Sequence, residues 1–262
     1  MKTVILCGGL GTRIRDISSE MPKPMIPIGA TPILWHIMRS YSAHGFKDFV
    51  LCLGYQSQVI KQFFLNYTLN TRDVTLALGR NSKVEIEDHA ASEAEGWRVT
   101  LAETGLHTMT GGRVRRIERY IGNDPYFMLT YGDGVSDVDI KALVAFHKSH
   151  GKLLTITGVR PPGRFGELTV ENGTEVVGFN EKPKVAGGLI SGGYFVCSRE
   201  IFRYLADGDD TLVLEKEPMN RLAADGEIRV FAHAGFWHPM DTYRDYAYLN
   251  ELWEQGAAPW KP

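Results

Sequence analysis

The chain has no surplus of basic side chains: 29 Lys and Arg stand against 31 Asp and Glu, for a net charge of -2. Proteins that bind nucleic acid or anionic membranes through charge carry a basic excess. The sequence also lacks an apolar stretch of ~18 residues, the length that spans a bilayer. The apolar run Val4–Cys7 ends at two glycines, too early for a signal peptide. We therefore expect neither a nucleic-acid partner nor a membrane partner.

Cysteine is scarce and carries no metal or redox pattern. Cys7, Cys52 and Cys197 are far apart, form no CxxC pair and each lie in an apolar, strand-like segment. This pattern predicts buried, reduced thiols rather than disulfides or zinc ligands. A cytoplasmic location is the corresponding expectation.

Several catalytic motifs are absent. No Gly-Lys-Ser or Gly-Lys-Thr of a Walker A loop occurs, and Ile14 stands where a GxGxxG fingerprint needs its third glycine. There is no GxSxG elbow and no HExxH, so the sequence offers no covalent or zinc-protease machinery. His147 and His150 are three residues apart, but we interpret them as packing and capping residues of a helix.

What the sequence does contain is an alternation of strands and helices. In the first half we expect strands at Thr3–Cys7, Phe49–Leu53, Val99–Ala102 and Tyr126–Thr130, with amphipathic helices between them. The run Leu153–Val159 reads as another strand. The alternation predicts an α/β fold with a Rossmann-like, mostly parallel mixed sheet flanked by helices.

After Gly151, shorter strand candidates are separated by Gly, Pro and polar turns, which predicts a smaller antiparallel portion. These strands are Glu167–Val170, Val176–Glu181, Gly193–Val196 and Ile228–Ala232, and the expected helices are Arg199–Leu205, Leu214–Ala224 and Tyr243–Trp253. We expect a single domain, 1–262, in which 1–150 mainly bind nucleotide and 151–262 mainly bind the second substrate.

The most informative segment is the glycine loop Leu6–Arg13, followed by Met21-Pro22-Lys23-Pro24-Met25. Glycines directly after a strand let backbone N–H groups approach phosphate oxygens. Arg13 and Lys23 add two cations suited to a triphosphate. Taken alone, a GGxG turn is equally compatible with a plain strand-to-helix connection.

Two aspartates are candidates for a metal site. Asp133 follows the strand Tyr126–Thr130 and is flanked by glycines, whereas Asp241 precedes the last expected helix. Mg²⁺ takes one or two protein carboxylates and completes its shell with phosphate oxygens and water. Without further context, Asp133 also fits a turn and Asp241 also fits a helix cap.

Two other elements carry cations. Glu181-Lys182-Pro183-Lys184 ends a strand, where the lysines could meet a phosphate or simply be solvated. Met109–Arg113 is a second glycine element, and an arginine at such a turn can donate to the cytosine ring or to phosphate. Aromatic residues in Phe63–Tyr67 suggest a subunit interface.

The pattern GGLGTR followed by PKPM resembles the signature of the sugar-1-phosphate nucleotidyltransferases. Pro32–Met38, Met109–Arg113, Tyr131–Gly134, Pro161–Gly166 and Gly235–Thr242 extend the resemblance, over effectively the whole chain, to the members that use CTP and glucose 1-phosphate. The resemblance implies the nucleotide-diphospho-sugar transferase type of fold, Mg²⁺ held by Asp133 and Asp241, and a homo-oligomer. The alternative functions are transfer of another nucleotide or to another sugar, or a non-catalytic regulatory subunit. Ser191 departs from the family pattern, because an asparagine is expected at this position in the sugar pocket.

The resemblance also implies roles for individual residues. The catalytic set is Arg13, Lys23, Asp133 and Lys182. The nucleotide-binding set is Leu6, Cys7, Gly8, Gly9, Leu10, Gly11, Thr12, Arg13, Lys23, Thr108, Arg113 and Gly132. The sugar-phosphate set is Tyr131, Gly166, Glu181, Lys182, Lys184 and Gly193.

Overall fold

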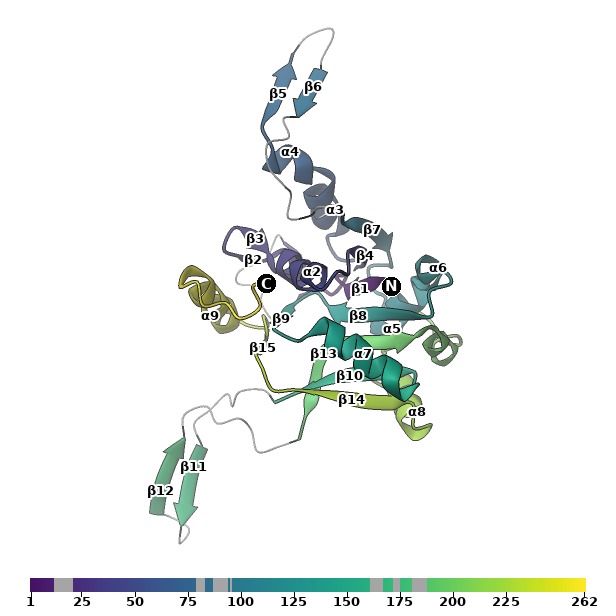
Figure 1. The fold of residues 1–262 in the computed structure, drawn as a ribbon, viewed down its shortest axis with the longest axis vertical. Coiled ribbons are helices and arrows are strands. Elements are labelled where there is room, and N and C mark those ends of the chain that lie inside the picture. Colours follow the sequence, from purple (N-terminus) through teal and green to yellow (C-terminus); the bar gives the residue numbers. More distant parts are fainter. Residues whose placement is uncertain are drawn as a thin grey trace.

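A computed structural model describes residues 1–11, 21–78, 83–86, 94, 96–160, 167–171, 175–180 and 188–262 of the chain. Its centre is a seven-stranded sheet in the order β14-β10-β13-β8-β1-β4-β7 (Figure 1). These strands are β1 (Thr3–Leu6), β4 (Asp48–Leu53), β7 (Arg98–Glu103), β8 (Tyr126–Tyr131), β10 (Leu154–Val159), β13 (Ile190–Ser198) and β14 (Ile228–His233).

Strand direction in this sheet is mostly parallel. β1 pairs in parallel with β4 and β8, β4 with β7, and β10 with β14. β13 lies between β8 and β10 and runs antiparallel to both. Because β1 and β8 are parallel neighbours, the loops that follow them leave the same edge of the sheet.

Helices cover both faces of the sheet, as the alternation of elements predicts. Ile5 packs in one core cluster with α2 (Ile33–Ala43), α7 (Ile140–His150) and α9 (Tyr243–Glu254). Its neighbours Val4 and Leu6 point to the other face, where the cluster is completed by α5 (Thr110–Arg116), α6 (Glu118–Ile121), the 3₁₀ helix η2 (Arg199–Tyr204) and α8 (Glu217–Ala224). The predicted mixed α/β fold is confirmed.

The second half is less separate than its sequence suggests. β10, β13 and β14 all belong to the main sheet, so its strands extend that sheet instead of forming a layer against it. The separate pairs are small: β2 (Pro27–Ile28) with β3 (Thr31–Pro32), β5 (Val74–Ala77) with β6 (Lys83–Ile86), β9 (Gly134–Ser136) with β15 (Trp237–Pro239), and β11 (Glu167–Glu171) with β12 (Glu175–Asn180). In Figure 1 the hairpins β5–β6 and β11–β12 project from opposite ends of the molecule.

Three local expectations have different outcomes. The helix predicted from Leu214 begins only at Glu217, with Pro218 in its first turn. The aromatic residues of α3 (Ser57–Leu65) and α4 (Tyr67–Thr71) are not an open aromatic surface, because Phe63 and Tyr67 pack on the ring of Trp35. The three cysteines are buried and free, as predicted, and burial raises the pKa of Cys52 to about 12.

Candidate active site

A cavity of about 590 Å³ opens where β1 and β8 end. Of the residues predicted to bind nucleotide or metal, all that the structure describes line it: Leu6, Cys7, Gly8, Gly9, Leu10, Gly11, Lys23, Thr108, Arg113, Gly132, Asp133 and Asp241. Tyr131 lines it as well, and Gly193 on β13 lies beside the Tyr131 ring. The predicted residues Thr12, Arg13, Gly166, Glu181, Lys182 and Lys184 lie outside the described residues.

The glycine loop continues β1 into the floor of the cavity. The N–H of Cys7 donates to the carbonyl of Cys52 at 3.0 Å, which keeps the chain in register with β4 for one more residue. The carbonyl of Gly8 then accepts from the N–H of Tyr55 at 3.3 Å, whereas Gly9 and Leu10 are exposed. The loop is therefore anchored at its start and open to a ligand at its tip.

Asp133 and Asp241 are brought together by a short antiparallel ladder. Asp133 directly precedes β9 and Asp241 follows β15, and these two strands pair with Gly134 opposite Pro239. The N–H of Met240 also donates to the carbonyl of Asp133 at 2.8 Å. The ladder thus holds two carboxylates that are far apart in sequence at the same side of the cavity.

Asp241 is not the cap of the last helix. Thr242 caps α9 and forms a capping box with Asp245. The Oδ2 atom of Asp245 also accepts the N–H of Asp241 at 3.1 Å, and its Oδ1 atom lies 3.0 Å from Nε2 of His238. Burial raises the pKa of Asp245, but the hydrogen bonds from Thr242 and His238 outweigh it and the pKa is lowered. Asp245 therefore orients the backbone that carries Asp241, a role that the sequence reasoning missed.

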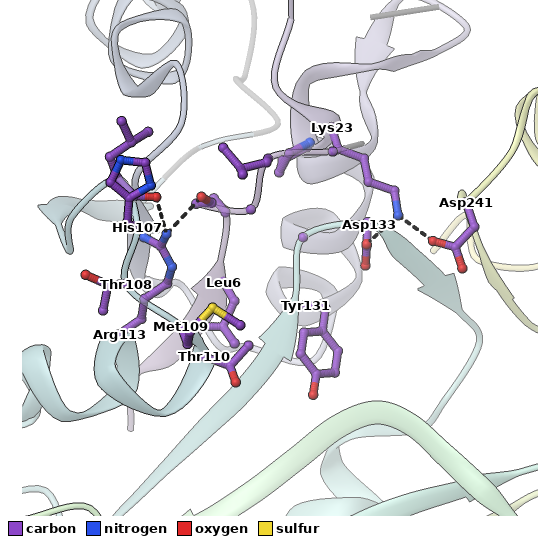
Figure 2. Close-up of a pocket in the computed structure, with 18 residues that line it drawn as sticks. Leu6, Lys23, His107, Thr108, Met109, Thr110, Arg113, Tyr131, Asp133 and Asp241 are labelled. Carbon is purple, nitrogen blue, oxygen red and sulfur yellow. Dashed lines mark hydrogen bonds and ion pairs between the residues drawn. The ribbon is translucent and has the colours of Figure 1, made fainter. Parts of the chain in front are cut away.

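Lys23 stands between the two carboxylates (Figure 2). It begins the 3₁₀ helix η1 (Lys23–Met25), and its Nζ atom lies 2.7 Å from Oδ2 of Asp133 and 2.6 Å from Oδ1 of Asp241. Burial lowers the pKa of Lys23, but the charge of Asp133 and the hydrogen bonds to both aspartates prevail and the pKa is raised. The two carboxylates thus converge on one position that already holds a cation.

This convergence meets the needs of a hard divalent ion. The described part of the chain holds no group of three or more His, Cys, Asp or Glu side chains that could bind a metal. Mg²⁺ needs only one or two carboxylates when phosphate oxygens and water supply the rest. Asp133 and Asp241 therefore fit a metal that is shared with a phosphorylated ligand.

Arg113 lies in the cavity wall opposite Lys23, and its guanidinium is bonded to groups of the protein itself. Its Nη1 atom donates to the carbonyl of Leu53 and to Oγ1 of Thr104, while Nη2 donates to the carbonyls of Gly8 and Leu106. The preceding glycines of the same element serve packing, because a Cβ on Gly111 would lie 2.8 Å from Cγ of Leu212. Burial lowers the pKa of Arg113.

Tyr131 and Thr110 share one carboxylate that no motif pointed to. The hydroxyl of Tyr131 donates to Oε1 of Glu215, and Oγ1 of Thr110 donates to Oε2 of Glu215 at 2.5 Å. Burial raises the pKa of Tyr131, and the nearby charge of Glu215 raises it further. Glu215 lies in a loop with no catalytic spacing, so only the folded chain reveals that it links two lining residues.

Comparison with known proteins places the chain in a family. The profile described as nucleotidyl transferase matches residues 2–250. The chain belongs to the nucleotidyl transferase family. Glucose-1-phosphate cytidylyltransferases of Salmonella typhi and Salmonella typhimurium (strain LT2) are each 51% identical to it over 261 residues, which cover 100% of this chain and 99% of each relative.

Solved structures agree on the fold. A crystal structure of UDP-glucose pyrophosphorylase complexed with UDP-glucose superposes on the present structure with a TM-score of 0.69 at 15% identity. The superposition covers 97% of this chain and 98% of the pyrophosphorylase chain. In the part of the chain that the structure describes, no helix has both the length and the apolar character required to cross a bilayer.

Proposed function

We propose that this protein transfers the cytidylyl group of CTP to α-D-glucose 1-phosphate, which yields CDP-glucose and pyrophosphate. The observation that carries the proposal is the 51% identity, over the full length, to two glucose-1-phosphate cytidylyltransferases. The cavity supports it, because a glycine loop, a lysine and two converging carboxylates are the groups that a triphosphate and a metal require.

The cavity suggests where each part of the substrates lies. The triphosphate would follow Leu6–Gly11, which line the cavity after a strand end and are exposed at Gly9 and Leu10. The nucleobase would lie toward the wall formed by Leu106–Met109, and the sugar phosphate toward Tyr131. The proposed contributions of Arg13, Lys182 and Lys184 concern residues outside the described ranges.

Mg²⁺ is the metal that we propose, and Asp133 and Asp241 would hold it. Their convergence on the Lys23 ammonium shows that both carboxylates already serve one cation. When bound, such an ion supplies charge neutralisation for phosphate oxygens.

The chemistry then requires positioning more than a protein nucleophile. An oxygen of glucose 1-phosphate attacks the α-phosphorus of CTP in line, and the bond to the pyrophosphate oxygen breaks. Because the attacking phosphate is already an anion, the protein contributes alignment and charge stabilisation. Lys23 is placed to donate to phosphate oxygens once substrate arrives, and Arg13 and Lys182 would add positive charge.

We further propose that the protein assembles as a homo-oligomer in the cytoplasm. Leu65 and Leu78 are 75% and 89% exposed on α3 and just beyond β5, and Leu69 and Leu76 are exposed nearby. A two-stranded hairpin with such apolar side chains gains stability when another surface covers it. The free thiols fit a reducing compartment.

The test is a pyrophosphate-release assay with glucose 1-phosphate and Mg²⁺, offering CTP, UTP, dTTP, ATP and GTP separately. We expect release with CTP, and CDP-glucose as the product. Release with a different nucleotide alone would retain the reaction and overturn the cytidylyl assignment. If none of the five nucleotides gives pyrophosphate, other sugar 1-phosphates are tested next. No release with those either would favour a regulatory protein that binds nucleotide without turnover.

A further inference from the structure

The strand β13 carries a bulge where it passes the cavity wall. Ile156 of β10 pairs with Phe195, but Gly158 pairs with Ser191, so β13 advances by four residues where β10 advances by two. Bulges are frequent next to active sites, where they redirect the chain. This bulge lies against the ring of Tyr131, the cavity residue toward which we place the sugar phosphate.

The bulge contains Gly192 and Gly193, and neither position has room for a side chain. A Cβ on Gly192 would lie 2.8 Å from Cγ1 of Val159, and a Cβ on Gly193 would lie 2.6 Å from Cδ2 of Tyr131. Gly193 also has a φ of +77°, in the left-handed region that glycine adopts readily. The Tyr131 ring therefore rests directly on the backbone of the bulge, and the position of this backbone sets the position of the ring.

Side chains hold both ends of the peptide that joins the two glycines. Its C=O, on Gly192, accepts from Nε1 of Trp237 at 2.6 Å. Its N–H, on Gly193, donates to Oγ of Ser191 at 3.3 Å. A peptide unit is planar, and a glycine on each side gives it the freedom to rotate as a unit. The two bonds together oppose this rotation.

Trp237 belongs to the ladder that carries the two candidate metal carboxylates. It begins β15, which ends two residues before Asp241. A second bond joins the ladder to β13, because the hydroxyl of Tyr194 donates to the carbonyl of Gly134 at 3.1 Å. In Figure 2, Tyr131 and the two aspartates lie on the same side of the cavity. The ladder and the bulge thus form one unit that places the Tyr131 ring relative to the carboxylates.

We propose that Trp237 is a positioning residue for the sugar-phosphate side of the cavity. Its indole N–H holds the Gly192–Gly193 peptide in one orientation, and this peptide supports the Tyr131 ring at the distance from the metal carboxylates that a hexose 1-phosphate requires. Among the described residues, Trp237 is not part of the cavity lining, so it acts through the bulge and not by contact with substrate. This role rests on the proposed nucleotidyl transfer.

The discriminating variant is Trp237→Phe, which keeps an aromatic ring and removes the indole N–H. Because the peptide is then free to rotate, we expect the KM for glucose 1-phosphate to rise about 3- to 10-fold, the effect of losing one hydrogen bond. The KM for CTP should change by less than about 2-fold, because the bulge lies on the Tyr131 side of the cavity.

The matched control is Trp97→Phe. Its indole N–H donates to Oγ of Ser42 at 2.8 Å, and Trp97 is part-buried like Trp237 and is likewise not part of the described cavity lining. Any loss of stability in this control should leave both KM values at the wild-type level. A loss of folded protein lowers the apparent kcat without changing KM, so a KM change separates positioning from a general structural role.

Ser191→Ala tests whether the two bonds act on one peptide. Alone it should raise the KM for glucose 1-phosphate about 2- to 3-fold, because Ser191 is exposed and water can replace its hydroxyl. Combined with Trp237→Phe it should add less than this factor, since both changes release the same peptide. Effects that multiply would give Ser191 and Trp237 independent roles and would overturn the inference.

The measurement is pyrophosphate release with the nucleotide and the sugar 1-phosphate that the wild type uses, each varied at saturating levels of the other, accompanied by melting curves. A wild-type KM for the sugar phosphate in Trp237→Phe, or an equal rise in both KM values, overturns the inference alone. If Trp237→Phe does not fold, Ser191→Ala decides, and a wild-type KM for the sugar phosphate in that variant overturns the inference. A wild type that releases no pyrophosphate with any nucleotide or sugar 1-phosphate overturns the proposed function as well.

Discussion

The ammonium of Lys23 lies 2.7 Å from the carboxylate of Asp133, although 110 residues separate them in the chain. The same ammonium lies 2.6 Å from Asp241, which is 218 residues away. The three side chains together carry one net negative charge. Because each is held by a different part of the fold, replacing one residue tests the site without dismantling its neighbours.

Replacing Asp133 should remove turnover and preserve the fold. Asp133→Asn keeps the size of the side chain but loses one of two anionic ligands, so we expect kcat to fall at least about 100-fold. The measurement is Mg²⁺-dependent pyrophosphate release, with a melting curve to verify folding. Asp207→Asn, at an exposed aspartate that does not line the cavity, is the control. Turnover close to that of the wild type would remove Asp133 from the mechanism.

A pair of variants should separate the two roles of the capping box on α9. Thr242→Ala removes the cap, which costs about 1 kcal/mol, but leaves the bond from the N–H of Asp241 to Asp245. Asp245→Ala keeps the bond from the backbone N–H of residue 245 to Thr242, but it removes the Asp245 side of the capping box and the bond from the N–H of Asp241. We expect similar losses of unfolding free energy but a kcat at least about 10-fold lower for Asp245→Ala than for Thr242→Ala. Equal kcat values would show that Asp245 acts only as a cap.

Glu215 should affect the sugar phosphate more than CTP. In Glu215→Gln the charge that accepts from both Tyr131 and Thr110 is lost, so one hydroxyl loses its acceptor. We expect the KM for glucose 1-phosphate to rise about 5- to 10-fold, with a smaller change in the KM for CTP. Glu217→Gln, two residues along at an exposed position, is the matched control. An increase confined to the KM for CTP would place Tyr131 on the nucleotide side of the cavity.

Acid should destabilise the protein through His147. This ring is buried, with Nδ1 2.8 Å from Oγ1 of Thr155 and Nε2 3.2 Å from Oγ of Ser198, and burial followed by the charges of His150 and Lys148 lowers its pKa to about 4. In the unfolded chain its pKa is about 6.5. Between these values the unfolded chain binds the extra proton, so the free energy of unfolding falls as the pH drops, by up to about 3 kcal/mol.

Urea unfolding at about pH 7 and about pH 4.5 measures this effect. In His147→Gln the acid-dependent loss should be smaller than in the wild type, whatever the stability at neutral pH. His107→Gln changes an exposed histidine and should keep the wild-type pH dependence. An unchanged dependence in His147→Gln would assign the acid sensitivity to other groups.

The pattern of neighbouring residues in the sequence was sufficient to predict much of the fold and part of the candidate site. The strands around Ile5, Phe49 and Met128 are continuous apolar runs, as strands buried on both faces must be. The glycine loop and Asp133 each directly follow one of these strands, so neighbouring residues alone place them at the ligand-binding edge of a parallel sheet. The second half was harder, because short strands between turns show no preference for a partner, and β10, β13 and β14 join the main sheet through pairings between distant segments.

The sequence by itself determined the class of the fold, the position of the glycine loop after a strand and the residue types of the site, because those depend on runs of neighbouring residues. Only the tertiary structure decided which of these residues meet. The β9–β15 ladder brings Asp241 beside Asp133, Lys23 fills the space between them, and Glu215 reaches Tyr131 from a loop with no motif of its own. The sequence also did not show that the Arg113 guanidinium donates to backbone carbonyls. A guanidinium can donate to a carbonyl or to a nucleobase, and its partners depend on which carbonyls the fold places within reach.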